Sequence, residues 1–385
     1  MKTVSIIAAL LAGFVLCADA PAGGDDTRQD KQPGQAPRQG EAEIPTYQVL
    51  NCEKDCRSTT PARVIDAPLP SYPLRYEGHG GYYVEALVDV DYTIAADGTV
   101  KDAAVESAVG PPEFADNTLR AVSARRYQPA MEGGQPVEEN HRVRFVFHAQ
   151  IRAEGARPSI VSAYQAAVQQ SRDNKTPQAI AALRDIVDRT QVNFYERTMA
   201  AYALAMLYAQ NGDYLTGREM IRIATIGEGQ YLEDGTTADA IRLRIRLEAL
   251  TGEFSEAFAW IGILRQIGAD DARESKVADT LRGLIAGPDP LTVEARIPAG
   301  GMPVFWQHTL LRRAFEFQAV EGKLDSFELR CRRHGMRSAV SDKSDWTIPA
   351  SWSGCFINVT GTPGTKFTFV EMPQAAGGTT RPAAP

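Results

Sequence analysis

The sequence predicts a multidomain α+β protein: a small ββαβ domain, then an array of helical hairpins, then a C-terminal β-sandwich. Three observations predict it. Alternating apolar residues with turn signals occupy residues 82–149, Ala- and Leu-rich amphipathic stretches occupy 158–285, and short alternating strands return over 291–372. With 385 residues, of which 44% are hydrophobic, the chain is long enough to form two or three domains, each with its own core.

The first 20 residues have the pattern of a cleavable secretory signal: Lys2, an apolar stretch over residues 4–16, and small residues at Ala18 and Ala20. We therefore expect export to the periplasm with cleavage after Ala20. As a helix the apolar stretch would span roughly 20 Å, against roughly 30 Å for a bilayer core, so an uncleaved inner-membrane anchor is a strained alternative. Lipidation at Cys17 is not favoured, because Leu16 stands where lipoprotein signals have a small residue.

Residues 21–45 are rich in Pro, Gly, Gln and Asp and have almost no large apolar side chains, so burial cannot offset the entropy of ordering them. They are predicted to be a flexible linker, and residues 374–385 a disordered tail. The formal net charge is −7, and it stays −7 without residues 1–20, which contain one Lys and one Asp. This charge argues against nucleic acid as a partner.

Four cysteines, Cys52, Cys56, Cys331 and Cys355, remain after cleavage, an even number that suits an oxidising compartment. Three pairings are open, and we expect sequence neighbours to pair: Cys52 with Cys56, and Cys331 with Cys355. The second bridge closes a loop of about 25 residues and would contribute roughly 3 kcal/mol. A zinc site is the alternative, but Cys-x-x-x-Cys without a well-spaced second pair is a weak zinc signal. We expect no metal and no cofactor.

Residues 155–288 are predicted to form helical repeats. The segment around Gly212 and Tyr214 is repeated 40 residues later around Gly252 and Phe254, with apolar residues at matching positions. A Gly-acid-aromatic turn followed by an amphipathic helix resembles tetratricopeptide-type repeats, although the period exceeds the usual 34 residues of that family. The sequence leaves open whether the array is a bundle packed for stability or a concave surface that holds a partner.

Residues 290–373 are predicted to form the β-sandwich. Leu329 and Cys331 share one face of a strand, as do Cys355 and Ile357, because strand side chains alternate; both cysteines should point inward. Two further clusters have structural interpretations that we favour: core aromatic residues rather than a sugar-binding surface, and a solvated edge rather than an anion site. The first comprises Trp306, Trp346 and Trp352, and the second Arg330, Arg332, Arg333 and Arg337.

Several separated features occur in one order between Arg63 and His148. The Asp97-Gly98 pair supplies the positive φ angles of a tight turn, which predicts an antiparallel hairpin around it. In chain order the features are Pro70-Ser71-Tyr72-Pro73, strands over 88–94 and 99–107 joined by Ala96-Asp97-Gly98, a helix near 113–126, Tyr127-Gln128-Pro129-Ala130, and a last strand over 141–149.

This order, over about residues 62–150, resembles the C-terminal domain of TonB-family proteins, and we assign residues 46–150 to it. The resemblance implies that the exposed final strand binds an extended peptide from an outer-membrane receptor or another envelope protein by strand addition. It also implies that Tyr72 and Pro73 contact the partner, although they could instead form only a packed turn. The receiving edge would be residues 141–148, centred on Val143, Arg144, Phe145, Val146 and Phe147.

We expect a periplasmic binding or scaffold protein. The alternative is a TonB-type energy transducer for outer-membrane receptor transport, which would need an uncleaved N-terminal anchor and inner-membrane motor proteins. As a flexible coil the linker would span only about 30 Å, which disfavours the transducer. No catalytic signature is present, so we expect no enzyme activity and no catalytic residues. His141 and His148 are separated by an odd number of strand positions and should face opposite sides rather than share a metal.

Overall fold

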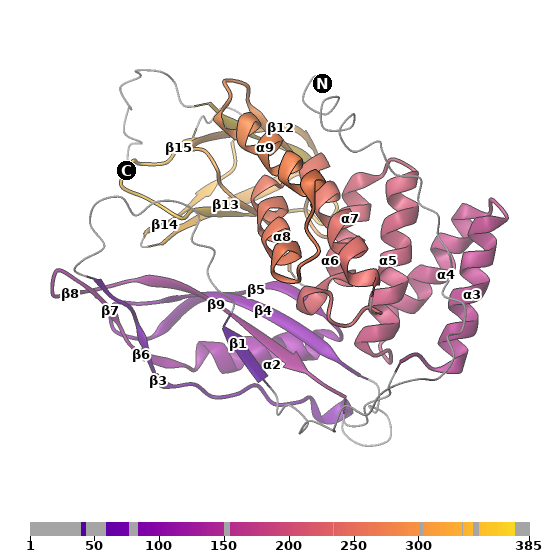
Figure 1. The fold of residues 1–385 in the computed structure, drawn as a ribbon. Helices are drawn as coiled ribbons and strands as arrows, with labels where there is room; N and C mark the ends of the chain where they lie inside the picture. The colour runs from indigo at the N-terminus through magenta and orange to yellow at the C-terminus, as the bar shows by residue number, and fades with distance from the viewer. Residues whose placement is uncertain are drawn as a thin grey trace.

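The computed structural model describes residues 40–43, 59–76, 84–149, 155–233, 235–299, 303–332, 334–341 and 346–373. Within them the chain forms the predicted α+β architecture, with a first β-rich domain, a helical array and a second β-rich region packed together (Figure 1). The expected signal over residues 1–20, Cys52, Cys56, Arg333 and the expected tail over 374–385 lie outside the described residues.

The first domain is built around β4 (Ala86–Ile94), which pairs antiparallel with β5 (Val100–Val109) and with β9 (Glu139–Phe147). Helix α2 (Pro112–Ser123) covers one face of this sheet and buries Phe114 there. The predicted ββαβ order is confirmed. Short elements complete the domain: β2 (Thr59–Thr60), β7 (Ala130–Glu132) and β8 (Gln135–Val137) in one small sheet, β3 (Arg63–Asp66) and β6 (Arg126–Gln128) in another, and the 3-10 turn η2 (Leu74–Tyr76).

The β4–β5 hairpin turns at Gly98, as the sequence predicts. The Gly98 N–H donates to the Ala95 carbonyl at 2.9 Å, and the Ala95 N–H donates to the Thr99 carbonyl at 2.8 Å. Gly98 has a φ of 83°, and a Cβ there would lie 1.9 Å from the Tyr127 carbonyl oxygen. Glycine is therefore required twice, for its backbone angle and for the close approach of β6.

The linker expected over residues 21–45 is structured near its end. Gly40–Glu43 form β1, antiparallel to β9, so the sheet order is β1-β9-β4-β5. A four-residue segment with one Gly and two Glu has little intrinsic β propensity, so its composition predicts no strand. Pairing with an edge that is already formed orders it.

The helical array consists of successive antiparallel hairpins, seen in magenta to orange in Figure 1. The two segments that match in sequence form equivalent hairpins, and Gly212 and Gly252 end their first helices with φ angles of 77° and 87°. The helices are α3 (Pro158–Arg172), α4 (Thr176–Asp188), α5 (Phe194–Gln210), α6 (Tyr214–Ala224), α7 (Thr236–Leu250), α8 (Phe254–Gln266) and α9 (Ala272–Ala286), with the 3-10 turn η3 (Ile226–Gly229) after α6.

The C-terminal region forms two four-stranded sheets around a shared aromatic core. The predicted Cys331–Cys355 disulfide is present, with Cα atoms 3.9 Å apart. Trp306 is buried and packs on Phe367 and Phe369, so it is a core residue. One sheet has the order β10 (Leu291–Arg296), β17 (Lys366–Met372), β12 (Ala314–Glu321), β15 (Trp346–Thr347); the other has β11 (Trp306–Thr309), β16 (Phe356–Gly361), β13 (Leu324–Cys331), β14 (His334–Ala339).

The three regions meet on the face of the first sheet that α2 leaves open. Every residue of β4 is buried, although its alternating Val-Asp pattern is typical of a strand with one solvated face. Leu87 packs on Phe194 of α5 and on Ile226 of η3, and Gln307 of β11 donates to Asp91 at 2.8 Å. The first domain is thus covered on both faces, by α2 and by the rest of the chain.

Candidate peptide-binding edge

The strand β9 has one edge on β4 and the other on β1. Its pairing with β4 runs from Glu139 opposite Ile94 to Phe147 opposite Ala86. On its outer edge Glu43 lies opposite Val143 and Gly40 opposite Val146. The receiving edge predicted from the sequence is therefore occupied, at residues 143–146, by a segment of the same chain.

The side chains of Val143, Phe145 and Phe147 do not line this edge. They are between 1% and 4% exposed and belong to the core under α2, where the Phe147 ring packs 4.8 Å from that of Phe114. Of the predicted contact residues, these three can meet a partner only through their backbone.

The other face of β9 carries Arg142, Arg144 and Val146. Arg144 forms a bidentate pair with Asp89, at 2.7 and 2.9 Å, and Arg142 reaches Asp91 at 2.6 Å. Val146 packs against the Phe194 cluster. The Arg144 side chain is therefore engaged within the fold, and both faces of β9 are covered.

The Arg144–Asp89 and Arg142–Asp91 pairs form a ladder of buried charges across β9 and β4, and a third carboxylate, that of Glu106, joins this ladder 2.7 Å from Arg142 Nε. Burial raises the pKa of Glu106 well above its usual range, and the nearby Asp91 and Asp89 raise it further, while Arg142 opposes them. For Arg142 the balance is reversed: burial lowers its pKa, but Asp91 and Glu106 raise it more. Removing either partner of such a buried ion pair would leave an uncompensated charge in the interior, which destabilises the fold.

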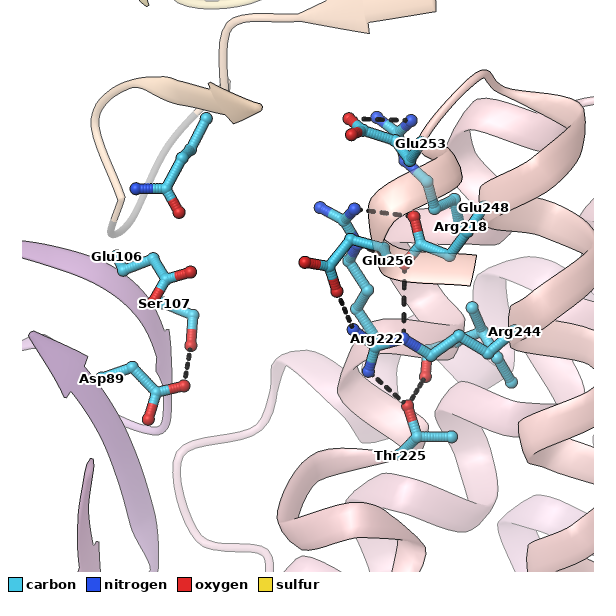
Figure 2. A network of polar contacts seen from close by, with 12 residues as sticks. Asp89, Glu106, Ser107, Arg218, Arg222, Thr225, Arg244, Glu248, Glu253 and Glu256 are labelled. Carbon is cyan, nitrogen blue, oxygen red and sulfur yellow. Dashed lines mark hydrogen bonds and ion pairs between the residues drawn. The ribbon is translucent and has the colours of Figure 1, made fainter. Parts of the chain in front are cut away.

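The helices facing this ladder carry a second charged network (Figure 2). Arg222 of α6 makes two 2.7 Å bonds to Glu248 of α7, and Arg244 Nη1 donates to Thr225 at 2.8 Å. Figure 2 shows these groups pointing toward the same space as Asp89 and Glu106 of the sheet. The charged side chains are thus paired within the sheet and within the helices, and the two networks face each other where the first domain meets the helical array.

Tyr72 and Pro73 lie in a packed turn before η2. The Tyr72 hydroxyl donates to the Val84 carbonyl at 2.7 Å, and its ring contacts Phe114 edge-on at 4.9 Å. Pro73 is buried, and its carbonyl accepts the Tyr76 N–H at 2.9 Å. These contacts serve the fold, and a role of the two residues in partner binding stays a prediction.

Sequence reasoning missed β1 and the buried ladder. The ladder had a signal that could have been used: acidic residues alternate at Asp89 and Asp91, and basic residues alternate at Arg142 and Arg144 on a strand expected to be in the same sheet. Cross-strand charge pairs follow from such a pattern. β1 had no comparable signal.

His141 of β9 and His148, which directly follows β9, contact different parts of the fold, in keeping with the prediction that they face opposite sides. The His141 ring lies 5.8 Å from Tyr92, and the His148 ring lies 6.3 Å from Phe194 of the helical array. Across the part of the chain that the structure describes, no cluster of three or more His, Cys, Asp or Glu side chains could hold a metal ion.

The family model for the Gram-negative bacterial TonB protein C-terminal domain matches residues 82–149. Residues 82–149 are a TonB C-terminal domain. Among solved structures, the solution NMR structure of the Pseudomonas aeruginosa TonB C-terminal domain is similar, at 25% identity over 24% of this chain and 90% of that chain, with a TM-score of 0.21. No curated protein matches the chain.

TonB C-terminal domains interact with outer-membrane receptors and other envelope proteins, and the family implies a periplasmic location for this one. The matched region contains the β4–β5 hairpin, α2 and β9, the elements that build the edge. Tyr72 and Pro73 precede it. Among the described helices, none is both long and apolar enough to cross a membrane.

Proposed function

We propose that this protein captures an extended peptide of an envelope protein or outer-membrane receptor as an added strand on β9. The observation that supports it most is the antiparallel pairing of β1 with β9. β1 is short and comes from a segment far from β9 in sequence, so its pairing indicates that the edge can accept a strand that the domain core does not supply.

Backbone pairing is the main recognition available at this edge. The side chains of β9 are engaged under α2 on one face and against the helical array on the other. A guest strand therefore gains affinity from N–H and C=O groups along β9, and its own side chains meet whatever lies beside the edge.

β1 competes with any guest. A tethered segment acts at an effective concentration in the millimolar range, so an external peptide must pair better than Gly-Glu-Ala-Glu or be present at high concentration. Better β-formers than this segment, such as Val, Thr or aromatic residues, give a guest that advantage.

The test uses the full chain with β1 disabled by the double substitution Glu41→Pro/Ala42→Pro. Alternate residues of a strand direct their N–H groups to opposite edges, so two adjacent prolines remove at least one bond to β9. The matched control, Glu41→Gln/Ala42→Ser, keeps both N–H groups. Deleting residues 141–150 is unsuitable, because it removes Phe145 and Phe147 from the core.

A labelled peptide with the sequence of residues 38–46 is titrated against both variants by fluorescence anisotropy. We expect binding to the proline variant and binding at least about tenfold weaker to the control, because of the tethered competitor. Two further peptides carry N-methyl groups at alternate positions, in complementary sets. One set should abolish binding and the other should not, because only alternate N–H groups face β9. Equal binding by both sets, or no binding to the proline variant, would contradict strand addition.

A further inference from the structure

A groove of about 300 Å³ lies where the first domain meets the β-sandwich. The first domain lines it with the end of β4, the start of β5 and the start of β9. The sandwich lines it with β13 and β14. The groove is therefore a product of domain packing, and neither domain forms it alone.

The groove is lined by four cations and three carboxylates: Lys101, Arg330, Arg332 and Arg337, and Asp102, Glu138 and Glu328. Lys101 pairs with Glu138 at 2.6 Å, and Glu328 lies 3.0 Å from Arg330 and 3.7 Å from Arg337. The Arg332 side chain is exposed and makes no ion pair with the residues that the structure describes, although its positive charge helps to lower the pKa of the nearby Glu139. The groove thus offers positive charge beyond what its own carboxylates neutralise.

Arg330 is the best-anchored of these cations. It is 4% exposed, and its Nη2 donates to the Asp102 carbonyl at 2.7 Å. Its Nε and Nη1 have no hydrogen-bond partner. A buried guanidinium with unpaired N–H groups is costly unless a further acceptor completes it. Instead of the solvated edge expected for this residue, the structure places Arg330 at a domain junction.

A local distortion of β5 positions the Asp102 carbonyl that accepts the hydrogen bond from Arg330. Asp102 has a φ of 51° at a break in the register between β4 and β5. A non-glycine residue in this conformation is strained, and such bulges re-aim backbone groups near functional sites. The bulge presents the carbonyl that fixes the guanidinium.

The opposite wall is held from the sandwich side. Cys331, which forms the disulfide with Cys355, lies between Arg330 and Arg332 in sequence, and the Asn140 side-chain amide donates to its carbonyl. The His334 ring stacks on Trp352 at 4.9 Å. The Asn140 contact holds the β13–β14 hairpin, which carries the arginines, against the start of β9, and the other two contacts hold that hairpin within the sandwich.

Asn140 belongs both to β9 and to the groove. A guest that takes the direction of β1 runs antiparallel to β9, with the position of Glu43 opposite Val143. Three more guest residues, at about 3.3 Å each, bring its C-terminal end level with Asn140, one strand spacing of about 4.8 Å away. A guest strand therefore leads toward the groove with its C-terminal end.

We propose that the groove binds a carboxylate at the C-terminal end of the guest strand, either the chain terminus or an acidic side chain. The inference rests on the proposed strand addition and adds the chemistry of the partner: an extended peptide that ends in negative charge. Arg332 supplies an exposed cation and Arg330 the unpaired N–H groups, so the contact is a charge-assisted hydrogen bond. The acidic sequence of β1 itself, Gly-Glu-Ala-Glu, is in keeping with this preference.

The test uses the full chain carrying Glu41→Pro/Ala42→Pro and the peptide Gly-Glu-Ala-Glu-Val-Thr-Val, with either a free C-terminal carboxylate or a C-terminal amide. We expect the free acid to bind roughly tenfold more tightly than the amide. A third peptide, amidated and ending in Glu, separates the chain terminus from a side-chain carboxylate and should bind like the free acid if either source suffices.

The preference is then measured in Arg332→Gln, which changes an exposed residue, and in Arg330→Gln. A matched control, Arg282→Gln, removes one positive charge from α9. The acid preference should fall to near unity in Arg332→Gln and Arg330→Gln and persist in the control. If the free acid and the amide bind equally, the groove does not bind a carboxylate, and this inference fails while strand addition stands. A preference that survives both groove variants also overturns it. Absence of binding by every peptide overturns strand addition and this inference with it.

Discussion

His308 of β11 places its Nδ1 atom 2.6 Å from Oε2 of Glu253, the residue directly before α8. On its other side, Nε2 lies 3.0 Å from Oε1 of Glu371. All three side chains are buried. Burial lowers the pKa of His308, but the two carboxylates raise it to about 10, so the imidazolium clamps the sandwich to the helical array.

This clamp predicts a pH dependence of stability. The pKa of His308 rises from 6.5 to about 10 on folding. Its contribution to the free energy of unfolding is therefore complete below pH 6.5 and is lost as the pH rises toward 10. For Glu253, burial raises the pKa, but His308 and Arg218 lower it from 4.5 to about 2; its contribution is complete above pH 4.5 and is lost below. The free energy of unfolding should be highest between pH 4.5 and 6.5.

Urea unfolding across pH 5 to 10 checks the alkaline side. The decline above pH 6.5 should flatten in His308→Gln and persist in His334→Gln, which changes an exposed histidine. The same decline in His308→Gln as in the wild type would contradict the assignment.

Removing one partner of the buried Arg144–Asp89 pair should destabilise the protein strongly, whereas replacing both partners with apolar residues should have little effect on stability. Arg144→Met leaves Asp89 buried with Ser107 as its remaining side-chain partner, and should lower the free energy of unfolding by about 3 kcal/mol. The double variant Arg144→Met/Asp89→Leu should recover most of that loss. As a surface control, Arg282→Met breaks an exposed pair and should cost less than about 1 kcal/mol. Additive losses in the double variant would argue against a coupled pair.

Two equivalent glycines should differ in their tolerance of alanine. Gly212 has a φ of 77° and open space around it, whereas a Cβ on Gly252, with a φ of 87°, would lie 2.2 Å from the Thr292 carbonyl oxygen. Gly212→Ala should lower the free energy of unfolding only by the backbone strain at positive φ, about 1 kcal/mol. Gly252→Ala must also displace β10, so its melting temperature should fall clearly further. Equal shifts would mean that the contact between α7 and β10 yields easily.

The Cys331–Cys355 disulfide should stabilise the sandwich. The double variant Cys331→Ala/Cys355→Ala should lose roughly 2–4 kcal/mol in unfolding free energy. Cys52→Ala/Cys56→Ala is the control, since that predicted bridge closes a tiny loop. Peptide mapping under non-reducing conditions checks both pairings directly, and a Cys52–Cys331 or Cys56–Cys355 link would refute them.

The mature protein should begin at Pro21. Intact-mass measurement on protein purified from the periplasm gives the N-terminus, and a chain that retains residues 1–20 would favour the anchored transducer over the exported binding protein. The same measurement detects a lipid on Cys17.

The local elements were predictable because their signals are local. The Asp97-Gly98 turn demands a positive φ, and the Gly212 and Gly252 repeat marks equivalent hairpins. Which faces those elements leave open was not predictable. The alternating Val-Asp pattern of β4 is typical of a half-exposed strand, yet both of its faces are buried, because Arg142 and Arg144 neutralise its acids and the helical array covers them.

The sequence by itself predicted the order of the three regions and the hairpin of the TonB C-terminal domain, and it favoured the pairing of Cys331 with Cys355 over two alternatives. Tertiary structure alone decided that β1 lies on β9 and that Arg330 and Asn140 line one groove. The reason is physical: turns and amphipathic faces depend on side-chain type, whereas an open strand edge consists of backbone groups that every residue shares. What occupies such an edge depends on which segments the packed domains bring to it.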